Sequence, residues 1–174
     1  YVNSRELPQR GGGYAEAIVV PASAVFEMPD NVDATQAVAL GNYQLSWLLL
    51  NYASIPRAGD RILVHAAAGG VGGALVQVAK SMGLTVFGIA GSKAKADYVS
   101  RQGADAVIDR NAEDIGTRIA DLTDGEGVDF IYDSVAGPGL SDDFAMLAPM
   151  GTVVMFGYLG GDPAPDLFTP MRAK

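Results

Sequence analysis

Cysteine is absent from the 174-residue chain, and histidine occurs once, as His65. Without cysteine the chain forms no disulfide and no thiolate zinc site. With a single imidazole, a metal site would depend almost entirely on carboxylates, so we predict that no metal is bound. No nucleophile with a base and an orienting residue can be assembled from the other side chains, so hydrolytic chemistry has no support.

Clusters of basic residues and long apolar runs are absent as well. The chain has 12 Lys and Arg against 20 Asp and Glu, which leaves a net charge of −8 at pH 7. No group of cations is available to follow a phosphate backbone, so nucleic acid is not an expected partner. No apolar run reaches membrane-spanning length, and no basic segment leads into a signal-like core. Both observations favour a cytoplasmic protein with no membrane contact.

Glycine, in contrast, is abundant, with 22 residues. The most informative glycines follow an apolar run at 61–64, which predicts a strand, and open a helical pattern at 70–82. Ala67, Gly69 and Gly72 have the spacing of the dinucleotide-binding fingerprint, with alanine in the first glycine place. The N–H groups that open this helix would face a pyrophosphate, where the helix dipole favours negative charge. Taken alone, the glycines are equally compatible with a buried turn.

The rest of the chain decides between these two interpretations. Short apolar segments alternate with helical patterns, which predicts strands at 85–89, 106–108, 128–132 and 152–156 and helices at 94–102, 115–122 and 140–147. This alternation is typical of the α/β class, here a Rossmann-like, doubly wound parallel sheet with helices on both faces. Ligands of such sheets bind beyond the carboxyl ends of the strands, so residues 65–70, 89–93, 133–137 and 156–160 should share one edge.

The first 60 residues carry weaker signals. Residues 14–20 have the composition of a short strand that Pro21 ends. Asp33 and the glutamine three positions later have capping-box spacing, which predicts the start of a helix. Residues 37–52 are apolar on most sides, and we expect two buried helices there with a break at 41–42.

The end of the second predicted strand indicates which dinucleotide is bound. NAD sites carry an acidic residue there for the ribose 2′-hydroxyl, but no Asp or Glu occurs between Gly72 and Asp97. Ser92 and Lys95 stand in that region, and Arg110 follows the third strand. Their hydroxyl and cationic groups are suited to the 2′-phosphate of NADP, so we predict NADP(H) as the cofactor. The alternative is that Ser92 only caps a helix and the cations are solvated.

Three ordered motifs extend this interpretation to nearly the whole chain. Residues 12–16 (Gly-Gly-Tyr-Ala-Glu), 64–72 (Val-His-Ala-Ala-Ala-Gly-Gly-Val-Gly) and 103–109 (Gly-Ala-Asp-Ala-Val-Ile-Asp) resemble the zinc-independent quinone oxidoreductase branch of the medium-chain dehydrogenase/reductase superfamily. The resemblance implies hydride transfer from NADPH to a small-molecule quinone or an activated C=C (enoyl or enone) substrate, usually in a homodimer. It also implies that residues 1–30 end a GroES-like catalytic domain and that residues 31–174 form the NADP-binding domain without its C-terminal part.

By position, the same resemblance suggests cofactor-binding residues but no catalytic residue. They are Ser46 near the nicotinamide; Ala68, Gly69, Gly70 and Val71 at the pyrophosphate; Gly91, Ser92 and Lys95 at the 2′-phosphate; and Ser134, Val135, Phe156, Gly157 and Tyr158 beside the ribose and nicotinamide. Two residues depart from the family pattern. Arg110 stands where tyrosine is frequent, and it either strengthens phosphate binding or points to solvent. Asn42 stands where a small or apolar residue is expected.

Other polar residues have simpler interpretations. His65 is expected to pack and hydrogen-bond at a strand end rather than to act as an acid. Asp133 is expected to bond backbone amides or a ribose. Asp142 and Asp143 diverge on a helix, so we expect both on a solvated face. Two other functions stay open: a non-catalytic nucleotide-binding module, and the enoyl reductase unit of a polyketide synthase.

Overall fold

Residues 1–2, 7 and 13–161 are described by the computed structural model of the chain. The chain divides into two units, Tyr1–Gly41 and Asn42–Lys174. Gly12, in the first family motif, and residues 162–174 of the expected cofactor domain lie outside the described part. The assignment of residues 1–30 and 31–174 to two domains of different function stays a prediction. Among the described residues, no helix is long and apolar enough to cross a bilayer.

The first unit contains little regular structure. Its elements are a 3-10 turn, η2 (Ala22–Ala24), and a short helix, α1 (Ala34–Ala37). α1 begins where it was predicted, because the Asp33 carboxylate accepts a hydrogen bond from the Thr35 N–H at 2.6 Å. The strand predicted at 14–20 is wrong, since that segment is irregular. A short β pattern needs a neighbouring strand, and within the described part of this unit the β pairing is limited to one isolated bridge between Val2 and Val25.

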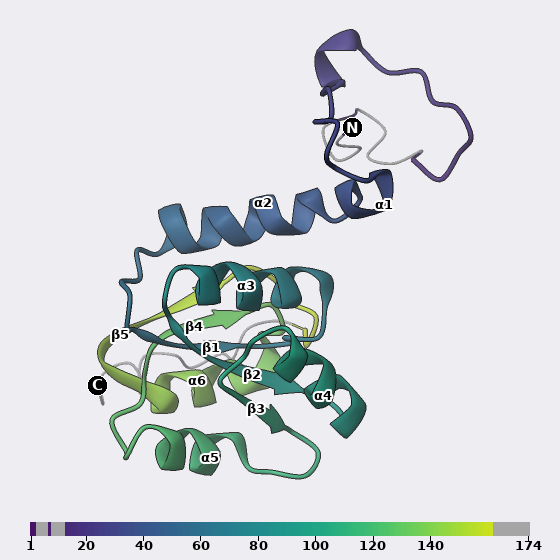
Figure 1. Ribbon diagram of the computed structural model, residues 1–174. Coiled ribbons are helices and arrows are strands. Elements are labelled where there is room, and N and C mark those ends of the chain that lie inside the picture. The colour runs from purple at the N-terminus through teal and green to yellow at the C-terminus, as the bar shows by residue number, and fades with distance from the viewer. Residues whose placement is uncertain (3–6, 8–12, 162–174) are drawn as a thin grey trace. The chain divides into compact units, whose positions relative to one another are not determined.

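A parallel five-stranded sheet forms the centre of the second unit (Figure 1). Its strands are β1 (Arg61–Val64), β2 (Thr85–Ala90), β3 (Ala106–Asp109), β4 (Val128–Asp133) and β5 (Leu147–Met155). They lie in the order β3-β2-β1-β4-β5. The chain therefore returns from one edge to the middle of the sheet after β3. The strand order reverses between β1 and β4, which is the position where doubly wound sheets bind their ligands.

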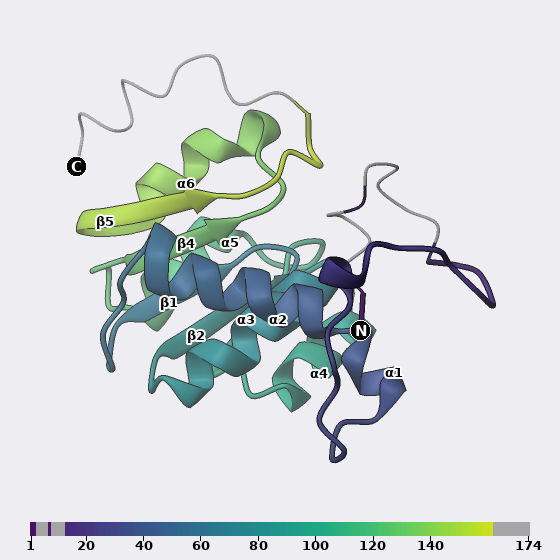
Figure 2. The same cartoon turned by 90° about the horizontal axis from the view of Figure 1, so that it is seen from above.

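Helices cover both faces of this sheet, as predicted. They are α3 (Gly70–Ser81), α4 (Lys93–Arg101), α5 (Ile115–Leu122) and α6 (Leu140–Met146), with a 3-10 turn, η4 (Gly137–Gly139), before α6. Alternate residues of β1 explain the arrangement: Ile62 and Val64 belong to one apolar cluster with Leu75 of α3, whereas Leu63 belongs to a second cluster with Ile119 of α5. α3 and α5 therefore lie on opposite faces, as Figures 1 and 2 show.

The helical segment before β1 differs from the prediction. α2 (Leu40–Leu48) runs through residues 41–42 without a break and leads into a π-helical turn, η3 (Leu49–Ala53). A glycine inside a helix costs only about 1 kcal/mol relative to alanine, which packing readily offsets. α2 is also less buried than expected, because Trp47 and Leu48 are 50% and 48% exposed.

β5 begins at Leu147 rather than at the predicted residue 152, and its first part is irregular. Its register against β4 shifts between Val128 and Phe130. Gly127 packs directly against this irregular part, because a Cβ there would lie 2.6 Å from the carbonyl carbon of Leu147, and its φ is +83°. Only glycine accepts both conditions. The apolar run at 152–156 marks only the later part of the strand and not this bend.

Candidate functional site

The turn from β1 into α3 has the geometry of an anion-binding loop. The Ala67 N–H bonds the Ile89 carbonyl at 3.0 Å, which extends the sheet into the turn. α3 then begins at Gly70, and its N-cap residue, Gly69, offers no side-chain hydrogen bond to the helix. The first turn of α3 carries no acidic residue. Its first N–H groups and the positive end of its dipole therefore remain available for an anion.

Close packing explains the third residue of the fingerprint. A Cβ at Gly72 would lie 2.8 Å from the Ala67 Cα and would also meet the Ala66 carbonyl. A Cβ at Gly70 would lie 2.6 Å from Nδ2 of Asn42, so the Asn42 amide covers the start of α3. A polar side chain thus borders the predicted pyrophosphate loop, a contact that the sequence alone did not reveal.

Of the residues predicted at the 2′-phosphate, Gly91, Lys95 and Arg110 line one cavity of about 230 Å³, whereas Ser92 is not part of its lining. Its lining consists of Ala66, Ala68, Gly69, Ile89, Ala90, Gly91, Lys95 and Arg110. The Arg110 side chain lies against Gly91, where a Cβ would be 3.4 Å from the arginine Nε. The cavity therefore joins the turn after β1 to the ends of β2 and β3, and its lining holds two cations and no carboxylate.

The neighbouring polar residues at the start of α4 make different contacts. Ser92 is the N-cap residue of α4, and its hydroxyl accepts a hydrogen bond from the Lys95 N–H at 3.4 Å. Lys93 pairs with Asp97 at 3.3 Å on the exposed surface. Among the described residues, neither Lys95 nor Arg110 forms an ion pair. These two side chains are therefore the cations available to a ligand in the cavity.

The loops that follow β4 and β5 are bonded to each other. The Phe156 N–H donates to the Asp133 carbonyl at 2.8 Å, and the Gly160 N–H donates to the Val135 carbonyl at 2.6 Å. A Cβ at Gly157 would lie 2.6 Å from the Ser134 carbonyl oxygen. The structure thus brings together the residues predicted beside the ribose and nicotinamide, namely Ser134, Val135, Phe156, Gly157 and Tyr158.

Ser46 lies at the contact between α2 and α3. Its side chain is fully buried, and its hydroxyl donates to the Asn42 carbonyl at 2.8 Å and to the Val71 carbonyl at 3.2 Å. Ser46 therefore joins α2 to α3 inside the unit, and its predicted contact with the nicotinamide stays a prediction.

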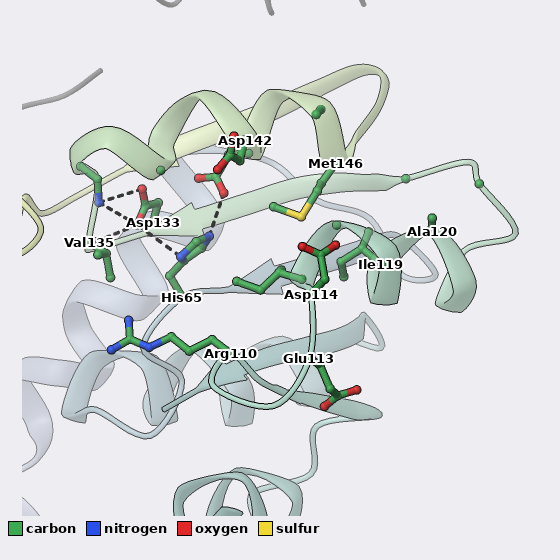
Figure 3. Close-up of a pocket in the computed structure, with 18 residues that line it drawn as sticks. His65, Arg110, Glu113, Asp114, Ile119, Ala120, Asp133, Val135, Asp142 and Met146 are labelled. Carbon is green, nitrogen blue, oxygen red and sulfur yellow. Dashed lines mark hydrogen bonds and ion pairs between the residues drawn. The ribbon is translucent and has the colours of Figure 1, made fainter. Parts of the chain in front are cut away.

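His65 joins two buried carboxylates at the end of β1 (Figure 3). Its Nε2 lies 2.8 Å from Oδ1 of Asp143 on α6, and its Nδ1 lies 3.7 Å from Oδ1 of Asp133 at the end of β4. Asp133 also accepts the Val135 N–H at 2.7 Å and the Ala136 N–H at 2.9 Å. His65 therefore packs and hydrogen-bonds as predicted, and Asp133 bonds backbone amides.

Asp143 corrects the prediction of a solvated acidic face on α6. Its neighbour Asp142 is exposed, but Asp143 is completely buried. Among the described residues, its Oδ2 has no hydrogen-bond partner. The spacing Leu140, Asp143, Met146 follows the buried side of α6, so helical periodicity was the signal that could have identified this residue.

Burial and charge act against each other in this cluster. Burial of the His65 ring favours its neutral form, but the hydrogen bond and charge of Asp143 and the charge of Asp133 outweigh it, so the pKa of His65 is raised. Burial also raises the pKa of Asp143, because the bond and charge of His65 offset it only in part. An ion pair alone would lower the pKa of the carboxyl. The pKa of Asp143 is raised instead, because its carboxyl group is completely buried. Both members of the His65–Asp143 pair therefore lose their protons at a higher pH than the same groups do in water.

The cluster also lines a second, larger hollow of about 700 Å³, together with Arg110, Glu113 and residues of α5 and α6 (Figure 3). His65, Asp133 and Asp143 are the one group in the described part whose possible metal-ligating atoms come together, within 4.8 Å of one another. The ring nitrogens of His65 face carboxylates and the Asp133 oxygens accept amides, so we interpret the group as a hydrogen-bonded cluster. The prediction that no metal is bound stays a prediction.

Known proteins share this architecture. The family described as zinc-binding dehydrogenase matches residues 70–173. The quinone oxidoreductase of Pseudomonas aeruginosa is 36% identical over 152 residues, which cover 86% of this chain and 46% of that protein. A component of the phenolphthiocerol/phthiocerol polyketide synthase of Mycobacterium tuberculosis is 34% identical over 157 residues, which cover 90% of this chain and 7% of that protein.

A solved structure of a quinone oxidoreductase is also similar to this chain. The Escherichia coli quinone oxidoreductase complexed with NADPH superposes with a TM-score of 0.81 and 29% identity, over 87% of this chain and 47% of that one. The chain spans about half the length of the quinone oxidoreductases that it matches. With its dinucleotide fingerprint, its parallel sheet and these relatives, the chain belongs to the zinc-independent quinone oxidoreductase branch of the medium-chain dehydrogenase/reductase superfamily.

Proposed function

We propose that the chain binds NADPH at the carboxyl edge of its sheet and is the cofactor-binding part of an oxidoreductase. One observation carries the proposal: Lys95 and Arg110 line a single cavity with the anion-binding turn after β1, and no carboxylate lines it. A carboxylate selects the ribose 2′-hydroxyl of NAD, whereas two cations favour the 2′-phosphate of NADP.

The strand order supports an orientation for the cofactor. From β3 toward β5, the edge presents Arg110 and Lys95, then the turn at 66–70, then the loops at 134–135 and 156–158. A dinucleotide extended along this edge would place its 2′-phosphate at β2 and β3 and its pyrophosphate at the start of α3. Its nicotinamide would then lie at β4 and β5.

Bound NADPH would supply the hydride, and the residues of this chain would bind and orient the cofactor. We propose a quinone or another activated C=C compound, such as an enone, as the small-molecule acceptor. The quinone oxidoreductase relatives and the NADPH complex of the Escherichia coli protein support this choice. We further propose that the protein is a cytoplasmic homodimer that binds neither metal nor nucleic acid. No residue of this chain is assigned to the chemical step.

The similarity to a polyketide synthase, over 90% of this chain, favours a second acceptor within the same chemistry. An enoyl thioester is also an activated C=C compound, so the two substrates differ in the carrier and not in the hydride transfer. A comparison of a quinone with an enoyl thioester as acceptor decides between them.

Cofactor titration of the complete gene product tests the proposal. We expect fluorescence titration to show tighter binding of NADPH than of NADH. Equal affinities, or no binding at all, would contradict the assignment. If NADPH binds and neither a quinone nor an enoyl compound oxidises it, the chain is instead a non-catalytic nucleotide-binding module.

A further inference from the structure

His65 connects three elements at the point where the strand order reverses. It directly follows β1, and its N–H donates to the Tyr132 carbonyl of β4 at 3.0 Å. Its ring bonds Asp143 of α6 at 2.8 Å and faces Asp133 at 3.7 Å. The ring is largely buried, with 16% of its side chain exposed. None of the cofactor-binding roles proposed above depends on these contacts of His65.

Asp133 gives the loop after β4 its shape. Its carboxylate accepts hydrogen bonds from the N–H groups of Val135 and Ala136, so the chain folds back over its side chain. Ala136 has a φ of +52°, a conformation that is unfavourable for a residue with a side chain. Such a conformation persists where surrounding contacts hold it. The carboxylate of Asp133 supplies these contacts, and His65 faces that carboxylate.

The same loop carries the residues proposed to border the nicotinamide half of the cofactor. Ser134 and Val135 stand within it, and their carbonyls accept N–H groups from the loop after β5, at 3.3 Å from Leu159 and 2.6 Å from Gly160. A displacement of Asp133 would therefore move both loops together. The position of the Asp133 carboxylate therefore determines the conformation of the loops that border the nicotinamide half of the cofactor.

We propose that His65 is a positioning residue of the cofactor site: anchored by Asp143, it holds Asp133 and thereby the 133–137 loop in the conformation that receives the nicotinamide half of the dinucleotide. The inference rests on the proposed NADPH binding and adds to it a residue that need not touch the cofactor. We expect the same effect for NADPH and NADH, because no residue of the 133–137 loop lines the cavity that holds Lys95.

The charges around the ring make this positioning depend on pH. Asp133 faces it from β4, Asp143 and Asp142 belong to α6, and Arg110 follows β3. With a protonated ring, the two buried carboxylates are held together. After the ring loses its proton, Asp133 and Asp143 repel each other and add negative charge beside a polyanionic cofactor. Affinity for the cofactor should therefore fall as pH rises through the pKa of His65.

Four variants of the complete gene product test the inference. His65→Leu removes both ring contacts, and we expect the Kd for NADPH and for NADH to rise by roughly tenfold each, as expected for one lost hydrogen bond between charged groups. His65→Gln keeps a donor for Asp143 without a titratable ring, so it should restore most of the affinity. Asp143→Asn should resemble His65→Leu in direction, and Asp142→Asn, the exposed neighbour on α6, is the matched control.

The pH profile separates positioning from general support of the fold. The Kd ratio of His65→Gln to wild type, measured from pH 6 to 9, cancels the titration of the cofactor itself. We expect this ratio to fall as pH rises, because only the wild type loses affinity. A flat ratio, together with unchanged affinity in His65→Leu, would overturn the inference while leaving NADPH binding intact. Absence of NADPH binding by the wild type would instead overturn the proposed function.

Discussion

Two lysines at the start of α4 show that the position of a charge, and not the number of charges, sets the chemistry of this site. Lys93 and Lys95 are two residues apart, yet Lys93 pairs with Asp97 at the surface while Lys95 lines the cavity with Arg110. Ser92 caps the helix that carries both and so fixes their directions. A protein with an overall charge of −8 thus presents a locally cationic cavity to a phosphate.

Lys95→Ala should weaken NADPH binding and leave NADH binding nearly unchanged. A hydrogen bond to a charged group contributes about 1.5–3 kcal/mol, which corresponds to a Kd that rises roughly 10- to 100-fold. Isothermal titration with both cofactors measures the change. Lys93→Ala is the control, and an equal loss in both variants would show that net charge alone attracts the cofactor.

Gly72→Ala and Gly73→Ala should have opposite effects on stability. The new Cβ at position 72 would lie 2.8 Å from the Ala67 Cα, whereas at position 73 the nearest atom would be 3.7 Å away. Overpacking typically costs about 1–3 kcal/mol, while alanine in a helix interior gains roughly 0.5–1 kcal/mol over glycine. Urea unfolding of both variants measures the difference. If both lose stability alike, the close approach of α3 to the turn is not the cause.

At the scale of elements, local sequence patterns predicted most of the strands and helices that alternate from β1 to β5. The helix at 115–122 was predicted with its observed bounds, because Asp114 caps it by accepting the Thr117 N–H at 2.8 Å. β2 was predicted because buried parallel strands are nearly continuous apolar runs, and β4 has the same character although Asp129 interrupts its apolar residues. The bend in β5 was missed, since it depends on the backbone of Gly127, which lies far from it in the sequence.

In the site, too, local sequence patterns were informative, whereas contacts between distant residues were not visible in the sequence. The turns after β1, β2 and β3 lie at one edge, as expected because a parallel sheet brings its carboxyl ends together. The buried contacts of Ser46 and Asp143 did not follow from the sequence, since each depends on which side of a helix meets a neighbour in space: Ser46 bonds the Val71 carbonyl of α3, and Asp143 bonds His65. Spacing in the sequence indicates a helix face, but the partner of that face is set by the fold.

A buried hydroxyl pair joins the π-helical turn η3 to the sheet. The Ser54 hydroxyl lies 2.6 Å from the Tyr132 hydroxyl and donates to the Leu49 carbonyl at 2.7 Å. Burial raises the pKa of Tyr132 to about 12, although the bond to Ser54 opposes the shift, so the phenol stays neutral at ordinary pH.

Ser54→Ala should therefore reduce the free energy of unfolding by about 1–3 kcal/mol, because it leaves the buried Tyr132 hydroxyl without this partner, and Tyr132→Phe should cost about 1 kcal/mol. Urea unfolding of the single and double variants gives the coupling between the two groups. Tyr52→Phe is the control, since Tyr52 is 73% exposed. Additive losses would show that the two hydroxyls stabilise the chain independently.

At the scale of the whole molecule, the free energy of unfolding depends on pH through two sets of titratable groups, one with lowered and one with raised pKa values, whose effects on stability are opposite. The pKa values of Asp33, Asp105 and Asp114 are lowered, by hydrogen bonds to Thr35, to Lys80 and to Thr117, respectively, with burial opposing the shift most at Asp105. Their contribution is present above the ordinary aspartate pKa of 3.8 and is lost as pH falls through the lower folded values. His65 and Asp143 have raised pKa values and act in the opposite direction.

Stability should therefore fall as pH rises above 6.5, the ordinary pKa of histidine, because folded His65 holds its proton more tightly than the unfolded chain does. Its contribution is complete below 6.5 and disappears through the higher folded pKa, with a slope of at most about 1.4 kcal/mol per pH unit for one proton. Urea unfolding from pH 5.5 to 9 measures the slope, and His65→Gln should remove it. A wild-type stability that rises over this interval would mean that the folded ring is neutral, with Asp143 holding the shared proton instead.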